Sequence, residues 1–353
     1  MNYRYLTIFR SPNRELLELL NQNVIGTPGV SMLYQHQQVE EKLKGIADPY
    51  FVNVIRAGKI AGTCCFCSRI TLNQGQSIRS FYIRYFSFKD SFRRNSLRIK
   101  TVRGNNGLRK EIETMLNGGG LNCKPDKKFF HYAYVDLRNE RSALLCNEFG
   151  FESVRQFTAV VFSRLFPKIS RYKIIEVKAE TVHDLLTGFY GTCNTFSVEN
   201  LNNRTYTFIE DERGQRVAGI LTSPDRWKIH AMPGWMSTLM LNIFSRLPVM
   251  NKLLNKNFHF LSVDGVYVLP GYEKYFENLL ESLLAKHKLH TAIVMVDANS
   301  TMYAMLQSLR LGLLNKIRKE VRGNVIAKFV NFTEEEKADF KNHPVYISGI
   351  DAA

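Results

Sequence analysis

The feature that most constrains the fold is a faint internal repeat with a spacing of about 160 residues. The opening stretch RYLTIFRSPNRELLELL is echoed 167 residues later by RYKIIEVKAETVHDLLTGF, and both predict a short strand followed by an amphipathic helix. RAGKIAGTCCF (56–66) is echoed by ERGQRVAGILT (212–222), each with a Gly-containing turn before an apolar strand. YVDLRNERSALLCNEFGF is echoed by VMVDANSTMYAMLQSLRLGL, which aligns Asn139 with Asn299 and Gly150 with Gly312. Echoes that keep their order predict a duplicated architecture.

The repeat divides the chain into two predicted domains, 1–167 and 168–353, with the boundary near Pro167. Its 353 residues, of which 45% are hydrophobic, suffice for two cores of ordinary size. Each half is predicted to run strand, helix, hairpin, strand, helix, strand, helix, strand. The first half has extra residues between Arg94 and Gly107, and the second has a predicted apolar helical insertion over about 223–260.

The stretch at 135–151 has a specific spacing of polar, small and aromatic residues. In order it contains Asn139, Ser142, Leu145, Cys146, Gly150 and Phe151. This spacing resembles the GNAT superfamily of N-acetyltransferases, and the order of elements extends the resemblance over nearly all of both halves. It implies an α+β (α/β) fold class. Two tandem GNAT-like domains are expected, each a mixed, mostly antiparallel twisted sheet flanked by helices, with a splayed parallel strand pair.

The resemblance implies that the first half binds acetyl-CoA or another acyl-CoA. In the family the pantetheine arm bonds backbone groups that the splayed strands leave unpaired, and such groups are costly when buried. The contacts expected from this strand pair are Phe86, Ser87, Phe88 and Asn139. Asn139 can bond the coenzyme, cap the following helix, or do both.

Cys146 stands where many family members have a tyrosine that protonates the leaving coenzyme thiolate. A thiol can donate a proton in the same way, since its ordinary pKa is about 8.5. The alternative is that Cys146 only packs on an apolar helix face, beside Leu145 and Phe149. Packing is the preferred interpretation, because no neighbouring residue in the sequence would poise the thiol.

The phosphate-binding loop expected after the fourth strand is altered. One register aligns it with Arg93, Arg94, Ser96 and Arg98, and another with Arg103, Gly104 and Gly107 before the next helix. Both keep positive charge, and arginine side chains can pair with phosphates. In the second half the loop has Glu273, Phe276 and Glu277 instead. Like-charge repulsion there predicts that the second half does not bind the coenzyme.

The predicted insertion is apolar between Met232 and Phe260, with two short helices split by Pro248. It can pack over the second domain, line an acyl or apolar-substrate pocket, or touch a membrane surface. No run of uncharged apolar residues is long enough for a membrane span, and no signal peptide is recognised.

Composition favours a cytoplasmic protein with reduced thiols. The six cysteines provide no zinc-ligand spacing. Strand alternation is taken to point Cys65 away from both Cys64 and Cys67. The net charge of +16 attracts polyanions such as nucleic acid, acidic lipids or phosphorylated cofactors.

The sequence therefore predicts an acyl-CoA-dependent N-acyltransferase, in the simplest case an N-acetyltransferase, acting on a small-molecule or peptide amine. His131 and Asp136 are loose candidates for the base that such an amine requires. One alternative is a Fem-type aminoacyl transferase, a paired GNAT-like protein that uses charged tRNA, which the basic charge favours. Another is a non-enzymatic binding module made of two degenerate copies.

Overall fold

The computed structural model describes residues 3–89, 106–124, 126–234, 241–243, 246–247, 250–317 and 320–352. The N-terminal half contains β1 (Leu6–Phe9), α1 (Arg14–Asn21), β2 (Leu33–His36), α2 (Val39–Lys44), β3 (Pro49–Arg56), β4 (Lys59–Asn73), β5 (Gln76–Phe88), α5 (Asn106–Leu116), β6 (Phe129–Asp136), α6 (Glu140–Glu148) and β7 (Glu152–Ser163). The C-terminal half contains β8 (Ile174–Lys178), η1 (Ala179–Val182), α7 (His183–Phe189), η2 (Val198–Leu201), β9 (Thr205–Glu210), β10 (Arg216–Ala231), η3 (Met250–Lys252), β11 (Asn257–Val268), α9 (Glu273–His287), β12 (Thr291–Asp297), α10 (Thr301–Ser308), α11 (Leu313–Ile317), β13 (Arg322–Val330), α12 (Glu334–Asn342) and α13 (Gly349–Ala352). The predicted order of elements is present in both halves.

Local sequence signals explain where the first helix begins and which way it faces. The Asn13 side chain accepts a hydrogen bond from the Leu16 amide at 2.9 Å and so caps α1. Leu16, Leu19 and Leu20 share one face of α1 and are buried against the sheet. The helix is therefore fixed by its cap and its apolar stripe together.

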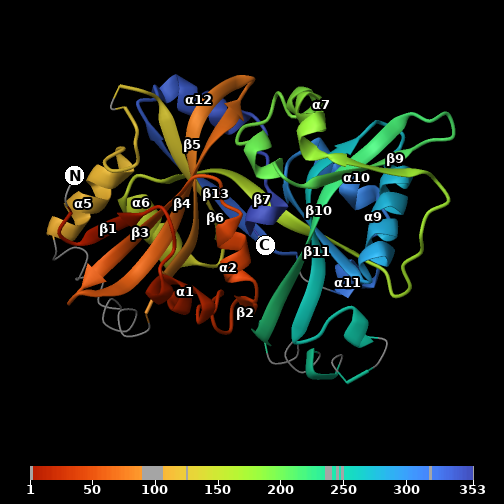
Figure 1. Cartoon of the computed structure of the whole chain (residues 1–353), viewed down its shortest axis with the longest axis horizontal. Helices are drawn as coiled ribbons and strands as arrows, with labels where there is room; N and C mark the ends of the chain where they lie inside the picture. The colour runs from red at the N-terminus through yellow and green to blue at the C-terminus, as the bar shows by residue number, and fades with distance from the viewer. Residues whose placement is uncertain are drawn as a thin grey trace.

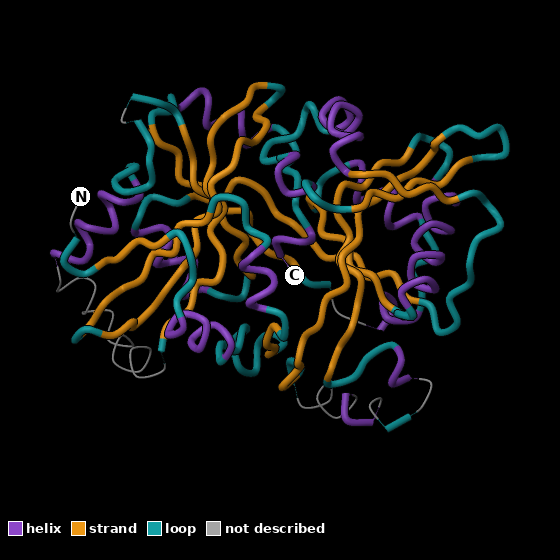
Figure 2. Tube along the Cα trace, in the orientation of Figure 1, coloured by secondary structure: helices purple, strands orange, loops and turns teal. Residues whose placement is uncertain are grey.

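One continuous 13-stranded sheet joins the described strands of both halves, in the order β1-β3-β4-β5-β6-β13-β7-β12-β11-β10-β9-β8, with β2 paired to β10. The strands of each half fan out as in twisted sheets (Figure 2). The parallel neighbours are β5 with β6 and β11 with β12, one pair in each half. This mixed, mostly antiparallel architecture confirms the predicted fold class.

The two halves exchange their last strands. β13 lies between β6 and β7, whereas β7 lies between β13 and β12. Each half of the sheet is thus completed by a strand from the other half, and the chain's C-terminal end lies near the centre of the molecule (Figure 1). The boundary at 167/168 stays a prediction.

The predicted insertion over 223–260 is too long. Residues 223–231 continue β10 and 257–260 begin β11, where Trp227 pairs with Phe258 in antiparallel register. In the connection between these strands, 241–243 are helical and η3 follows, whereas the remainder of the predicted helical pair lies largely outside the described residues. Leu241 and Leu253 are buried beside Trp227, so part of this segment packs on the second half.

The predicted orientation of Cys65 is wrong with respect to Cys67. Their Sγ atoms lie 3.9 Å apart, because residues two apart in a strand share a face. Cys64 lies on the opposite face, in a different core cluster. All six cysteines are free thiols.

Among the described residues, no helix is long and apolar enough to cross a membrane.

Candidate active site

The parallel strands β5 and β6 pair over only four residues and then separate. The register runs from Arg79 opposite Phe129 to Tyr82 opposite Tyr132, although β5 continues to Phe88 and β6 to Asp136. The strands therefore splay apart at their carboxyl ends. The splayed strand pair predicted from the sequence is present in the first half.

A β-bulge in β5 lies at this splay. Tyr85 and Phe86 fall outside the registers of both β4 and β6, whereas Arg84 pairs with Cys65 and Ser87 with Thr63. Tyr85 has a φ of 57°, a left-handed conformation that is unusual for an aromatic residue in a strand. Strained, unpaired backbone of this kind is concentrated at functional sites.

A cavity of about 1010 Å³ passes through the splay and opens on both faces of the N-terminal sheet. We call these the α5 face, which α5 and α6 cover, and the α2 face, which α1 and α2 cover. Ile83 and Ala133 line the cavity on the α5 face, whereas Arg84 and Tyr134 line it on the α2 face. The splay thus connects two compartments that the sheet would otherwise separate.

The compartment on the α5 face is apolar. Its lining includes Leu6, Val52, Val54, Cys64, Phe66, Leu108, Ile112, Met115, Leu116, Cys146, Phe149 and Phe151. Such a compartment suits an aliphatic chain.

The other compartment lies between the two halves. Its apolar lining comes from β7, β10, β11, β12, α11 and the connection between β10 and β11. It includes Phe157, Ala159, Val161, Trp227, Met232, Leu254, Phe258, Ile293, Met295, Leu314 and Ile317. Met232 and Leu254 belong to the predicted insertion, so that segment contributes to a pocket wall. Asp351 and His36 also reach this compartment.

The structure brings several of the predicted site residues together. Phe86, Phe88, Asn139 and Cys146 line the cavity, whereas Ser87 is buried beside it. Arg93, Arg94, Ser96 and Arg98 lie outside the described residues, as do Arg103 and Gly104 of the alternative register. Gly107 belongs to the first turn of α5.

Asn139 is the N-cap of α6. Its Oδ1 accepts a hydrogen bond from the Ser142 amide at 3.2 Å, and its side chain also borders the cavity. The match to Asn299 is one residue out of register, because Ser300 caps α10 through the Tyr303 amide. Gly150 follows α6 with a φ of 78°, as expected for a left-handed C-terminal glycine.

Replacement of Asn139 by Ala is expected to lower the free energy of unfolding by about 1 kcal/mol, through loss of the cap. Ser300→Ala is the matched control, since it removes the equivalent cap of α10 away from the cavity. Urea denaturation and coenzyme calorimetry measure the two effects separately. Only Asn139→Ala should also weaken coenzyme binding; equal losses of affinity would place the coenzyme elsewhere.

Cys146 is a largely buried thiol on the α5 face. Burial raises the pKa of Cys146 to about 11, so the thiol is protonated at neutral pH. That state is compatible with both predicted roles, packing and proton donation.

Cys146→Ala is expected to cost about 1 kcal/mol of stability and to change turnover by no more than a few-fold. The physical reason is that its neighbours in the core cluster are apolar, with Phe149 and Cys64 beside it. Thermal unfolding and acyl-CoA thiol release would be measured together. A loss of turnover of about 10²-fold in a folded, coenzyme-binding variant would instead identify a proton donor.

The two predicted candidate bases, His131 and Asp136, differ in whether they reach the cavity. His131 is fully buried among aromatic rings, its Nε2 lies 2.7 Å from the Leu116 carbonyl oxygen, and burial lowers its pKa to about 4. His131 does not line the cavity, whereas Asp136 does.

A third candidate base, His36, was not predicted from the sequence but also lines the cavity. Burial, followed by the charges of Lys42 and Arg84, holds the pKa of His36 well below its ordinary value. A neutral imidazole is therefore available there.

The corresponding splay in the second half is filled by the protein itself. β11 has its own bulge at Gly265, with a φ of 56°. Tyr206 donates a hydrogen bond to the Gly265 carbonyl, and the Gly265 amide donates to the Tyr346 hydroxyl. Gly349 approaches so closely that a Cβ there would lie 2.2 Å from the Val263 carbonyl oxygen. The C-terminal segment thus fills the gap between β11 and β12 in the second half, whereas the corresponding gap between β5 and β6 in the first half stays open.

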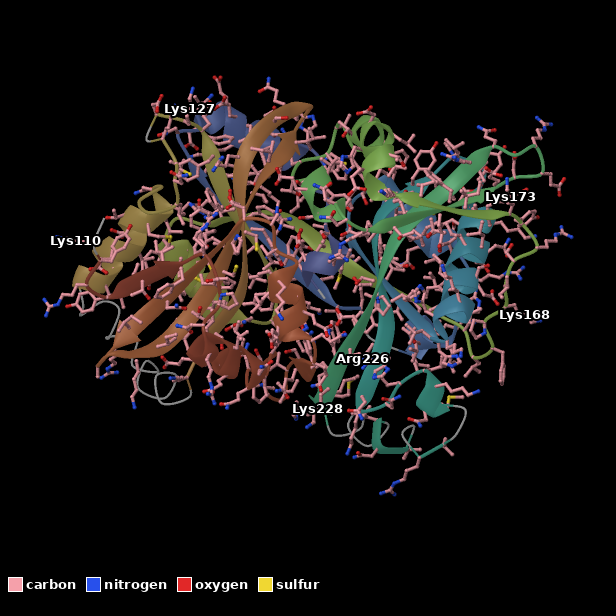
Figure 3. The ribbon with its side chains drawn as sticks, viewed as in Figure 1. Lys110, Lys127, Lys168, Lys173, Arg226 and Lys228 are labelled. Atoms are coloured by element: carbon pink, nitrogen blue, oxygen red, sulfur yellow. The ribbon has the colours of Figure 1, made fainter. Side chains whose placement is uncertain are left out.

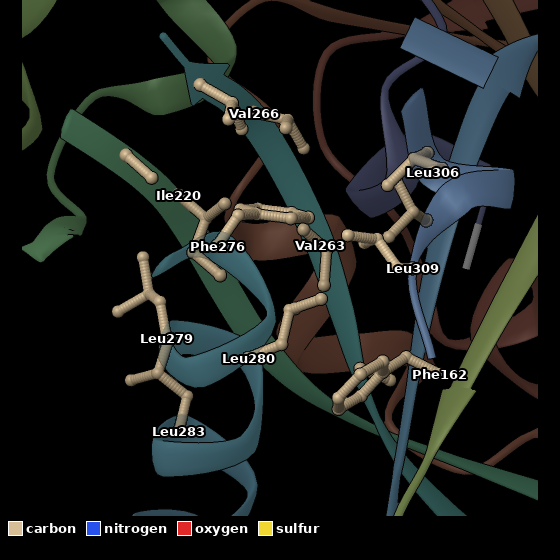
Figure 4. Close-up of a cluster of buried hydrophobic side chains, with 14 of the residues drawn as sticks. Phe162, Ile220, Val263, Val266, Phe276, Leu279, Leu280, Leu283, Leu306 and Leu309 are labelled. Atoms are coloured by element: carbon tan, nitrogen blue, oxygen red, sulfur yellow. The ribbon is translucent and has the colours of Figure 1, made fainter. Parts of the chain in front are cut away.

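The helix that corresponds to α5 also closes its side of the second half. Phe276, Leu279, Leu280 and Leu283 of α9 pack directly on Ile220, Val263 and Val266 of the sheet (Figure 4). Phe276 is fully buried, which explains the bulky residue in the altered phosphate loop. This face of the second half is a packed core.

The carboxylates of that loop have partners within the protein. Arg164 Nη2 lies 2.8 Å from Glu277 Oε1, and the Gly271 amide donates to Glu273 at 3.1 Å. These contacts support the prediction that the second half lacks a coenzyme site.

Comparison of the whole structure with solved proteins identifies the architecture. A structure of Saccharomyces cerevisiae N-myristoyltransferase with bound myristoyl-CoA superimposes with a TM-score of 0.58 and 10% identity, covering 98% of this chain and 90% of that one. The chain has the fold of N-myristoyltransferase. Another structure of that enzyme, with bound myristoyl-CoA and inhibitors, gives a TM-score of 0.57 and 11% identity, covering 99% and 87%.

This likeness confirms the tandem GNAT-like fold that the sequence predicts. No protein-family model and no curated protein matches the sequence. At such low identity the likeness establishes the fold alone.

Proposed function

We propose that the protein is an acyl-CoA-dependent N-acyltransferase that binds its acyl donor in the first half. The observation that carries this proposal is the contrast between the two splays. In the first, the strained backbone of Tyr85 and the unpaired backbone of Phe86 lie beside a cavity that passes through the splay, whereas side chains and the C-terminal segment fill the second. Unpaired backbone beside an apolar compartment matches the polar arm and apolar chain of an acyl-CoA.

The bulge is the proposed site of chemistry, and an acyl-CoA thioester supplies the activated acyl group. Backbone N–H groups at Tyr85 and Phe86 can stabilise negative charge on the thioester oxygen. The amine approaches from the α2 face, where His36 or Asp136 can accept its proton. The C–S bond then breaks, an amide forms, and the coenzyme thiolate takes up a proton.

The acyl chain is proposed to be longer than acetyl. The compartment on the α5 face is lined by aliphatic and aromatic side chains from β3, β4, α5 and α6, far more than a two-carbon group can contact. The myristoyl-CoA bound to the structural relative supports the same choice. Acetyl transfer, the simplest prediction from the sequence, is the alternative.

Calorimetric titration with acetyl-, octanoyl- and myristoyl-CoA tests the donor. We expect affinity to rise with chain length, because each buried CH₂ contributes up to about 0.8 kcal/mol. Equal affinities would favour acetyl transfer. No binding of any donor, with retention of tRNA, would favour the Fem-type alternative; binding of neither would favour a non-enzymatic module.

Arg93→Glu combined with Arg98→Glu is expected to weaken acyl-CoA binding by at least about 10-fold, since two charge-assisted contacts to phosphate would be lost. Lys127→Glu combined with Lys168→Glu is the matched control. Both control lysines are exposed and lie at opposite outer edges of the molecule (Figure 3). Unchanged affinity in the arginine variant would show that the phosphates bind elsewhere.

A further inference from the structure

A buried arginine that makes no hydrogen bond to the described part of the chain lies beside the bulge. The Arg84 side chain is only 9% exposed, lines the cavity, and donates no hydrogen bond to any described residue. Its Nη1 atom is 3.6 Å from Asp351 Oδ1, which is beyond hydrogen-bond range. The neighbouring Tyr85 hydroxyl is also buried without a hydrogen-bond partner among the described residues.

The nearest carboxylate is already engaged by other groups. Arg69 holds both oxygens of Asp351, at 2.6 and 3.3 Å, and Asn200 donates to Oδ2 at 3.1 Å. Asp225, on the same side of the molecule, is paired with Lys42 at 2.6 Å. Arg84 therefore shares Asp351 with Arg69 as the longer of two ion pairs, and its guanidinium also lies 4.3 Å from the centre of the Tyr85 ring. Two buried arginines thus face one carboxylate among the described residues, and a buried charge that is only partly compensated is costly.

The Arg84 side chain lies on the side of the sheet proposed for the acceptor amine, not on the side proposed for the acyl chain. Its side chain leaves β5 on the α2 face, opposite Ile83, which faces the apolar acyl compartment. Arg84 immediately precedes the bulge where the thioester is proposed to react. An anion bound by Arg84 would therefore lie close to the attacking amine.

The compartment between the halves indicates which kind of group the acceptor carries beside its anion. Trp227, Leu254, Phe258, Ile293, Leu314 and Ile317 line it and provide an apolar wall. A short polar head and an apolar group are thus accommodated side by side.

We propose that the acceptor is a free α-amino acid with an apolar side chain, whose carboxylate is bound by Arg84 and the Tyr85 hydroxyl. This inference rests on the proposed function and names its acceptor. An α-amino acid places its carboxylate one carbon from its amine, as the adjacency of Arg84 to the bulge requires. A peptide acceptor would present a neutral amide at the same place.

Acyl transfer to phenylalanine and to 2-phenylethylamine tests whether Arg84 binds the acceptor's carboxylate, the contact that we call the carboxylate anchor. The two amines differ only in that carboxylate. Thiol release is measured with the acyl-CoA that binds most tightly. In the wild type, kcat/KM for phenylalanine should exceed that for 2-phenylethylamine by about 10- to 100-fold, the value of a hydrogen-bonded charge. In Arg84→Gln that ratio should fall to near 1, with Arg84→Lys between. Arg79→Gln, on the same strand but outside the cavity lining, should keep the wild-type ratio.

A wild-type ratio near 1, or an unchanged ratio in Arg84→Gln, would overturn the carboxylate anchor while leaving acyl transfer intact. Efficient transfer to a peptide amine but not to phenylalanine would also overturn it. Calorimetric titration of phenylalanine into wild type and into Arg84→Gln tests the carboxylate anchor without turnover. We expect phenylalanine to bind the variant at least about 10-fold more weakly. Equal binding in both proteins overturns the anchor, whereas failure to bind any acyl-CoA overturns the proposed function separately.

Discussion

A fragment of residues 1–167 expressed alone is expected to be unfolded or aggregated, as judged by circular dichroism and gel filtration. It would contain β6 and β7 but not β13, the strand that lies between them. The register of β13 against β6 runs over eight residue pairs, from Gly323 with Asp136 to Val330 with Phe129. Without it, a long apolar strand edge would be exposed, and such edges aggregate.

The loss of side-chain burial would be as serious as the loss of strand pairing. Val325, Phe340, Val345 and Ile347 from the second half are buried in the same core cluster as Leu16 and Phe51. Each such side chain contributes about 1.5–3 kcal/mol when buried. Their removal would cost on the order of 10 kcal/mol, which is comparable to the whole stability of an ordinary domain.

A nick between the halves is the control for this experiment. Ile169 is 76% exposed in the connection between β7 and β8, so a protease site inserted there should be cleaved in the folded protein. The two pieces should stay together on gel filtration and keep the spectrum of the intact chain. A folded, monomeric fragment 1–167 would show that the exchanged strand is dispensable and that the predicted domain is autonomous.

The strand exchange could not be predicted from the sequence. The repeat indicates that each half ends in an apolar strand, and both β7 and β13 do. Hydrophobic pattern reports which face of a strand is buried, not which neighbours it pairs with. The element order and the splayed pairs were therefore predictable, but the partners of the last strands were not.

The sequence-based prediction differs from the structure at two further places, the end of β10 and Arg84, and each difference has its own cause. The end of β10 does carry a strand signal, since Trp227 and Ile229 alternate with exposed Arg226 and Lys228. That alternation distinguishes it from the helical insertion that was predicted. Arg84, in contrast, sits in a strand where a charged residue usually faces solvent. Only the fold shows that its side chain is buried between the halves, without a hydrogen bond to the described residues.

Ala133→Phe is expected to weaken acyl-CoA binding and to lower kcat/KM by about 10²-fold or more, because displacement of a reacting group by about 1 Å can reduce the rate by that factor. Ala133 lies on β6 beyond the last residue paired with β5, and it lines the cavity on the α5 face. A phenyl ring there would project into the opening through which the acyl group and the bulge must meet. The cavity provides room for the ring, so the melting temperature should change little.

Ala159→Phe is the matched control, since Ala159 lines the same cavity on the other side of the splay. It should keep acyl-CoA affinity within about 3-fold and should instead raise the KM for the amine. Calorimetry with the donor alone, followed by steady-state kinetics with the acceptor varied, separates the two effects. If both variants weaken donor binding equally, the acyl chain occupies the compartment between the halves, and the two faces of the N-terminal sheet must exchange their proposed roles.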